Sequence, residues 1–383
     1  MSHATGTMVL LDQSVPPRRA VTVGDGHGRY IIAHPDDGTA IAIHGFTVDG
    51  QAQTFTLEGN IGALQLWLVP RSDDPEAGFI LLWHGMSSPT LYRQFLDANG
   101  EPVGGEPEIL ASEEWTYING AVVGTVSDGR SIVAWVDWRG VNVQAYDAQG
   151  APSGERTIYP DYFYEPCFVP DEEGGFSIVG IQYGAYSNAI LGLRFDAELQ
   201  YQELKTIAVT PEPPAIATLP DGGLIAGWIS DGSLGIVFID ALALEETNAV
   251  SFDLSSPPAY GSLALAQMTD GDIVATWMQP GADGEPPALV GLRINADGSL
   301  DGGVFEIDGR PGIAPNQPAT ITAVAGGDFF ITVTVKEGGI TAVHHIEVNY
   351  ASDAPEGVDR TVALTEDGAS IWPRRLCASG RQQ

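Results

Sequence analysis

The chain has 383 residues and is strongly acidic, because 17 Lys and Arg against 50 Asp and Glu give a formal net charge of −33. Nucleic-acid binding needs clustered cations to neutralise phosphates, so this charge argues against a nucleic-acid partner and against an anionic membrane surface. The 44% of hydrophobic residues exclude a disordered acidic tail, since they can form a core. No apolar run approaches the roughly 18 residues of a membrane span, and the N-terminus is not typical of a secretory signal peptide.

One pattern repeats seven times along the chain: a turn rich in Asp and Gly, followed by a short apolar strand. The apolar segments are 29–34, 79–83, 131–135, 176–180, 224–228, 272–277 and 329–333. The last residues of successive segments are 49, 52, 45, 48, 49 and 56 positions apart, which is a period near 50. Four of the segments end in tryptophan, at Trp83, Trp135, Trp228 and Trp277. We expect these rings to pack between neighbouring sheets.

A second apolar strand with an Asp-containing turn follows each of these segments, clearly so at 92–105, 143–154, 191–200 and 290–303. Each period therefore contains four short strands rich in Val, Ile, Thr and aromatic residues. No segment has a helical period over about eleven residues. Four strands in each of seven periods predict an all-β fold, a seven-bladed β-propeller of four-stranded antiparallel blades.

We predict a single propeller domain over residues 1–368, followed by a basic C-terminal tail, 369–383. The expected repeats are 15–58, 59–112, 113–160, 161–210, 211–255, 256–309 and 310–365. Segment 7–13 resembles a fourth strand such as 106–112, yet it precedes the first repeat. We therefore expect the N-terminal strand to complete the last blade and close the ring.

The repeat also resembles that of a known class of proteins. Its D-G-G-[FL]-xxx-W strand and F-D-A-x-G turn, seen in 219–228 and 94–105, are similar to the propeller repeats of surface-exposed and secreted bacterial proteins. The resemblance covers most of the chain and implies a platform for interactions, not a particular activity. The first and seventh repeats depart from the pattern. The chain also lacks the Gly/Asp nonapeptide calcium tracts that often accompany such repeats.

Large aromatic side chains gather in the loops of the third and fourth repeats, at the blade ends opposite the acidic turns. We expect a ligand-binding surface formed by Trp115, Tyr117, Trp138, Arg139, Tyr162, Tyr183 and Tyr186. Aromatic rings flanked by polar groups bind sugars by stacking, and Trp, Tyr and Arg are also enriched in protein interfaces. Phe163 and Tyr164 belong to the same loops. Packing of the loops against each other is the third explanation of this pattern.

The acidic turns have a simpler explanation, because Asp-Gly is favoured in hairpins for backbone reasons. A ring of carboxylates for cations is the alternative, with Asp25, Asp73, Asp74, Asp128, Asp171, Asp221, Asp270 and Asp328 as its members. Loop 295–301 has alternating oxygen ligands but lacks the EF-hand pattern. His344 and His345 are adjacent in a strand, which opposes a shared metal. We expect no metal site and no cofactor.

These observations predict a non-enzymatic recognition or structural module with a protein or cell-surface glycan partner and a place in a larger assembly. The alternative is a propeller enzyme of the glycoside hydrolase, lyase or lactonase type. Its central-channel site would contain His34, His44 or His84 near carboxylates, and no catalytic residue can be assigned. Signal-independent exposure, as a phage or phage-like virion component, is favoured over a cytoplasmic scaffold. Cys167 and Cys377 are expected to be separate thiols.

Overall fold

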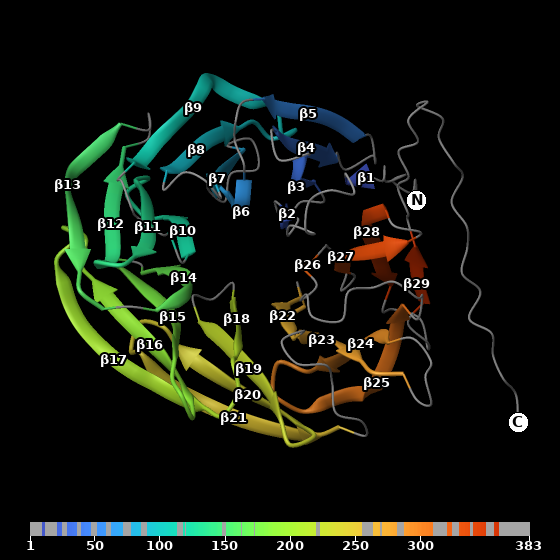
Figure 1. Ribbon diagram of the computed structural model, residues 1–383. Coiled ribbons are helices and arrows are strands. Elements are labelled where there is room, and N and C mark those ends of the chain that lie inside the picture. The colour runs from blue at the N-terminus through green and yellow to red at the C-terminus, as the bar shows by residue number, and fades with distance from the viewer. Residues whose placement is uncertain are drawn as a thin grey trace, which may run out of the picture. The chain divides into compact units, whose positions relative to one another are not determined.

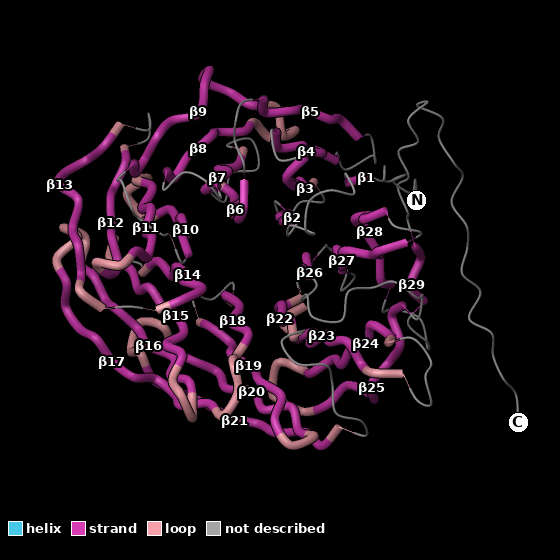
Figure 2. The backbone as a smooth tube through the Cα atoms, in the orientation of Figure 1, coloured by secondary structure: helices cyan, strands magenta, loops and turns pink. Residues whose placement is uncertain are grey.

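The structure is a computed structural model of the chain. It describes residues 10–11, 21–24, 29–36, 40–46, 52–58, 63–71, 78–85, 90–112, 118, 120–147, 151–161, 163–171, 173–219, 223–254, 263–268, 270–281, 287–308, 320–323, 329–337, 340–349 and 356–359. Every regular element in these residues is a β-strand (Figure 2). The predicted all-β class is confirmed. No described segment is a helix long and apolar enough to cross a membrane.

In the described part of the chain, the strands form six four-stranded sheets and one five-stranded sheet, all with antiparallel pairing between neighbours. The chain divides into two compact units. One unit comprises residues 62–98 and 102–257, and the other comprises 1–61, 99–101 and 258–383. Within the four-stranded sheets, strands that are consecutive in sequence lie side by side. Each sheet is therefore a simple meander.

The first unit contains four of these meanders, which follow one another along the chain (Figure 1). The inner strands of successive sheets contact each other, β6 with β10, β10 with β14 and β14 with β18. The strands are β6 (Ala63–Pro70), β7 (Phe79–Gly85), β8 (Thr90–Leu96), β9 (Pro102–Ser112), β10 (Gly120–Thr125), β11 (Ser131–Asp137), β12 (Gly140–Tyr146), β13 (Pro152–Tyr159), β14 (Tyr164–Pro170), β15 (Phe176–Tyr183), β16 (Asn188–Phe195), β17 (Tyr201–Thr210), β18 (Ala215–Thr218), β19 (Leu224–Ser230), β20 (Ser233–Asp240) and β21 (Glu245–Asp253).

The second unit contains the remaining three sheets, two of four strands and one of five. Strand β26 contacts both β22 and β2, so the sheet near the C-terminus lies between the other two. The strands are β1 (Leu10–Leu11), β2 (Val21–Gly24), β3 (Tyr30–Asp36), β4 (Ala40–Phe46), β5 (Ala52–Glu58), β22 (Ala264–Gln267), β23 (Ile273–Gln279), β24 (Ala288–Ile294), β25 (Leu300–Asp308), β26 (Thr320–Ala323), β27 (Phe329–Glu337), β28 (Ile340–Asn349) and β29 (Glu356–Asp359).

The five-stranded sheet contains strands from both ends of the sequence. Along the edge of β28, β1 pairs through Leu10 with Ala342 and through Leu11 with Thr341. Further along the same strand, β29 pairs with residues 346–349 of β28. The N-terminal segment therefore lies beside the last sheet, as its likeness to a fourth strand predicts. The C-terminal tail, 369–383, lies outside the described residues.

The core is formed by the second and third strands of the sheets. Every residue of β4, β11 and β12 is buried, whereas every residue of β13 is exposed or half-buried. A short, continuous apolar run is typical of a strand covered on both faces, and the predicted strands have this pattern. The outer strands have one face toward solvent, so their sequences are more polar.

Two of the four recurring tryptophans, Trp135 and Trp228, pack between sheets, as expected. Trp83, Trp135 and Trp277 are each 1% exposed. The core cluster that contains Trp135 also contains Ile80 and Leu82 of the preceding sheet. Trp228 is half-buried against a cluster that includes Val169 and Val179 of the sheet before it. Trp135 and Trp228 therefore join consecutive sheets in the first unit.

Candidate functional site

The turn between β11 and β12 presents the most exposed tryptophan of the described chain. Trp138 is 69% exposed and forms the two-residue turn together with Arg139. The fully buried carboxylate of Asp137 accepts hydrogen bonds from the backbone N–H of Arg139 at 2.8 Å and from its Nη2 at 2.9 Å. The guanidinium carbon of Arg139 lies 5.9 Å from the Trp138 ring centroid. This hairpin therefore exposes an indole ring on a turn that the hydrogen bonds between Asp137 and Arg139 stabilise.

Gly140 closes this turn, and its conformation explains why the position requires glycine. Its φ is +126°, which L side chains rarely adopt. A Cβ at this position would lie 1.9 Å from the carbonyl oxygen of Tyr159. The first residue of β12 therefore packs directly against the end of β13, which fixes the direction of the Trp138 hairpin.

The loop between β15 and β16 carries two more exposed aromatic rings. Tyr186 is 99% exposed and Tyr183 is 42% exposed. Tyr183 pairs with Asn188, which closes the loop. The ring of Tyr164, at the start of β14, lies 4.9 Å from that of Tyr183, with 50° between the ring planes. Tyr183 is thus supported from one side, whereas Tyr186 projects into solvent.

These two loops lie at corresponding ends of adjacent sheets, because each joins the second strand to the third. Strand β10 packs against β14 (Figure 1). A Cβ at Gly120 would lie 2.6 Å from Pro166. We refer to the surface formed by Trp138, Arg139, Tyr164, Tyr183 and Tyr186 as the hairpin surface. The other predicted members, Trp115, Tyr117 and Tyr162, lie outside the described residues.

The burial of Phe163 corrects part of the expectation that the aromatic residues of these loops form a ligand-binding surface. It is 0% exposed and belongs to the core cluster between the β10–β13 and β14–β17 sheets. A Cβ at Gly180 would lie 2.1 Å from its ring, so a glycine in β15 makes room for it. For this residue, packing of the link against the core is the correct explanation. An apolar ring without a polar tip needs such burial more than the tyrosines do.

A tyrosine pair joins the outer strands of the same two sheets. The rings of Tyr159 in β13 and Tyr201 in β17 are stacked, with centroids 4.1 Å apart. The hydrogen bond with Tyr201, followed by burial, raises the pKa of Tyr159 to about 12. Tyr159 is therefore an element of the contact between sheets, and it remains neutral at physiological pH.

The histidines proposed for an enzyme site are buried in their sheets. His34, His44 and His84 are 0%, 3% and 4% exposed. The Nε2 atoms of His34 and His44 lie 3.1 Å apart, and Nδ1 of His44 lies 3.0 Å from Oγ1 of Thr54. Burial, followed by the charge of His34, lowers the pKa of His44 to about 3. The His34 and His44 rings form a polar bridge across β3 and β4 that is buried, and it continues through His44 to the exposed Thr54 of β5.

The acidic turns that the structure describes are held by backbone amides and arginines. Asp171 Oδ1 accepts hydrogen bonds from the N–H groups of Glu173 at 2.9 Å and Gly175 at 2.7 Å. Asp128 accepts a bond from its neighbour Arg130 N at 2.9 Å and pairs with the Arg130 side chain at 2.6 Å. This agrees with the turn explanation. Asp25, Asp73, Asp74, Asp221 and Asp328 lie outside the described residues.

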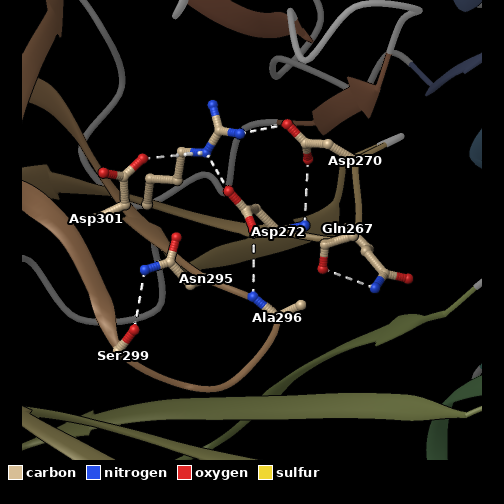
Figure 3. A network of polar contacts seen from close by, with 9 residues as sticks. Gln267, Asp270, Asp272, Asn295, Ala296, Ser299 and Asp301 are labelled. Carbon is tan, nitrogen blue, oxygen red and sulfur yellow. Dashed lines mark hydrogen bonds and ion pairs between the residues drawn. The ribbon is translucent and has the colours of Figure 1, made fainter.

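Asp270 belongs to the densest of these networks, in the β22–β25 sheet (Figure 3). The largely buried guanidinium of Arg293 pairs with Asp270, with Asp272 at 2.8 Å and with Asp301 at 3.6 Å. Nearby, Asp297 accepts bonds from the N–H and hydroxyl of Ser299 at 2.9 and 2.6 Å, which lower its pKa. Arg293 thus occupies the centre of the carboxylate cluster.

The described residues contain no group of three or more His, Cys, Asp or Glu side chains arranged to hold a metal ion. In loop 295–301, the carboxylate of Asp297 faces Ser299, and that of Asp301 faces Arg293. His344 and His345 occupy adjacent positions of β28, as predicted. Cys167 is a free thiol, and Cys377 lies outside the described part.

Sequence reasoning missed two supports of the hairpin surface. Asp137 precedes Trp138 directly, and its role could have been predicted from the D-W-R-G turn, where a carboxylate can accept the N–H two residues later. The contact of Tyr164 with Tyr183 depends on the register of β14 against β15, in which Tyr164 pairs with Ile181. No local signal in the sequence specifies that register.

No protein-family model and no curated protein sequence matches the chain. Among solved structures, it is similar to a functionally unknown protein from Desulfotomaculum acetoxidans DSM 771, with a TM-score of 0.52, 14% identity, and coverage of 82% of this chain and 90% of the other. The chain is also similar to BBS1N, solved in complex with ARL6DN, with a TM-score of 0.52, 11% identity, and coverage of 92% of this chain and 100% of the other. It is similar to the Dos1 propeller as well, with a TM-score of 0.52, 10% identity, and coverage of 95% of this chain and 86% of the other. At these identities the similarities show the fold alone, which is propeller-like.

Proposed function

We propose that the seven sheets form one closed seven-bladed β-propeller, the ring being completed where β1 joins β28. The repeat period, the meander order of the sheets and the pairing of Leu10 with Ala342 support this arrangement. Deletion of residues 1–13 tests it. Closure predicts a lower free energy of unfolding for the truncated chain, because the edge of β28 loses its partner. Unchanged stability would contradict closure by the N-terminal strand.

We further propose that the protein is a non-enzymatic binding module that contacts a protein or a glycan through its hairpin surface. The observation that carries this proposal is the exposure of Trp138, Tyr183 and Tyr186 at one end of two adjacent sheets. Large rings gathered in exposed loops are typical of interaction sites, since solvent exposure of such area is unfavourable. Asp137 stabilises the turn that carries Trp138, and Tyr164 contacts Tyr183, so these two rings have a support before a partner arrives.

Two observations favour binding over catalysis. The histidines that an enzyme site would use are buried and occupied by contacts within the sheets. In addition, a propeller-like neighbour of low identity, BBS1N, was solved in complex with a protein, ARL6DN. That neighbour shows that a similar architecture can serve as a protein-binding platform. The same role is what we propose for this chain.

Calorimetric titration with a panel of bacterial surface polysaccharides and charged peptides tests this function. The test protein carries Trp138→Ala, Tyr183→Ala and Tyr186→Ala together. The control carries Ile109→Ala and Val209→Ala, which remove two apolar side chains that are 57% and 63% exposed on outer strands. The proposal predicts binding that the triple variant loses and the control retains. Binding that the triple variant retains in full, or no binding to any probe, would overturn it.

A further inference from the structure

The end of the first unit that carries the hairpin surface is strongly acidic. The described residues of β10–β21 place six carboxylates and one cation at this end. The cation is Arg139, and Asp137 already pairs with it at 2.9 Å. The carboxylates belong to Asp137, Asp161, Glu165, Glu212, Asp231 and Asp253. Because the charges of Arg139 and Asp137 cancel each other, the other five carboxylates give this end a negative electrostatic potential.

Three of these carboxylates lie next to the aromatic rings or in a neighbouring loop. Glu165 is exposed and directly follows Tyr164, at an irregularity in the pairing of β14 with β15. Asp231 is exposed in the turn between β19 and β20, the equivalent hairpin of the next sheet. Glu212 follows the end of β17, where the hydroxyl of Thr210 donates to its backbone carbonyl at 2.8 Å. The rings therefore have acidic neighbours along two sheets.

Exposed aromatic rings with carboxylates beside them favour the binding of positively charged groups. An ammonium or guanidinium group is attracted to the face of Trp or Tyr, and a nearby carboxylate adds an ion pair. An anionic glycan would be repelled by the same carboxylates. A neutral glycan would stack on the rings but would gain no charge attraction. The net charge of −33 reinforces this preference by steering cationic partners toward the molecule.

We propose that the hairpin surface binds a protein segment rich in lysine or arginine. This inference rests on the proposed binding function and specifies the chemistry of its partner. The cationic side chains would contact Trp138, Tyr183 and Tyr186, while Glu165, Glu212 and Asp231 supply the opposite charge. Glu165 and Asp231 are exposed and Glu212 is half-buried, and the three lie on successive links and turns of two sheets. An extended segment that crosses these sheets can therefore contact them one after another.

The test is calorimetric titration with an oligolysine peptide of about ten residues, long enough to cross adjacent sheets. A first variant carries Glu165→Gln, Glu212→Gln and Asp231→Asn; asparagine tolerates the positive φ of 50° at position 231. A second, matched variant carries Glu173→Gln, Glu198→Gln and Glu246→Gln, which are exposed at the opposite end of the same sheets. Both variants change the net charge by the same amount, so they separate a local site from general attraction.

We expect the first variant to bind oligolysine about tenfold more weakly than wild type, since each exposed ion pair contributes modestly and three are lost. The matched variant should bind within about twofold of wild type, because its changes lie at the far end. Equal weakening in both variants would overturn the proposal. Binding of a neutral polysaccharide that depends on the aromatic residues, with no such difference for oligolysine, would also overturn it and would leave the proposed binding function standing.

Discussion

Protonation of His44 is expected to destabilise the protein as the pH falls from neutral. Burial, followed by the charge of His34, lowers the pKa of His44 from 6.5 to about 3 in the folded protein. The unfolded chain therefore binds more protons between these two values. The stability that neutral His44 contributes is present above pH 6.5 and is lost progressively as the pH falls toward 3. Between about pH 7.5 and 4.5, the expected loss is about 3 kcal/mol of unfolding free energy.

Urea unfolding followed by circular dichroism, at both pH values, measures this loss. His44→Gln serves as the comparison, because glutamine keeps a polar group opposite His34 and Thr54 but does not titrate. The carboxylates titrate in both wild type and His44→Gln, so their contribution cancels when the losses of unfolding free energy of the two proteins are subtracted. Wild type should lose about 3 kcal/mol more than the variant between the two pH values. An equal loss in both proteins would refute the argument that His44 is held neutral by its buried contacts.

Three further outcomes follow from the contacts described above. Trp135→Ala should lower the free energy of unfolding by about 3–5 kcal/mol in urea titrations because it empties a core position, whereas Trp138→Ala should change it by less than about 0.5 kcal/mol. Asp137→Asn removes the charge-assisted bond to Arg139 and should cost about 1–3 kcal/mol in the same assay; no loss would mean that the ion pair is dispensable. Burial, followed by the Glu165 charge, raises the pKa of Cys167 from 9.0 to about 12. In a Cys377→Ser background, its alkylation by iodoacetamide at pH 8 should be about a thousandfold slower in the folded than in the unfolded chain, and equal rates would contradict this.

The strands were predictable from the sequence because their physical causes are local. Segments such as 131–135 and 224–228 are continuous apolar runs bounded by Asp-Gly turns, and they form the buried strands β11 and β19. Trp138 was predictable as a loop residue for the same reason, since D-W-R-G is a two-residue turn between two such runs. Its exposure followed from its place at the tip of that turn.

The polar contacts between strands were not predictable, because they depend on how the strands are aligned. His34 and His44 meet because Ile32 pairs with His44 and His34 with Ala42, which places the two histidines diagonally on one face of the sheet. Arg293 reaches Asp270 across 23 positions of sequence. Sequence composition shows that such residues are present, but only the register of the strands brings them together.

Hydrogen exchange measured by mass spectrometry, with and without the tightest-binding probe of the panel, tests the binding account most directly. The account predicts slower exchange in the hairpins 137–140 and 183–188, where the ring-bearing turns would contact the partner. The turns at the opposite end, 126–130 and 171–175, should exchange at unchanged rates. Protection confined to those opposite turns would contradict the assignment of the hairpin surface as the binding site.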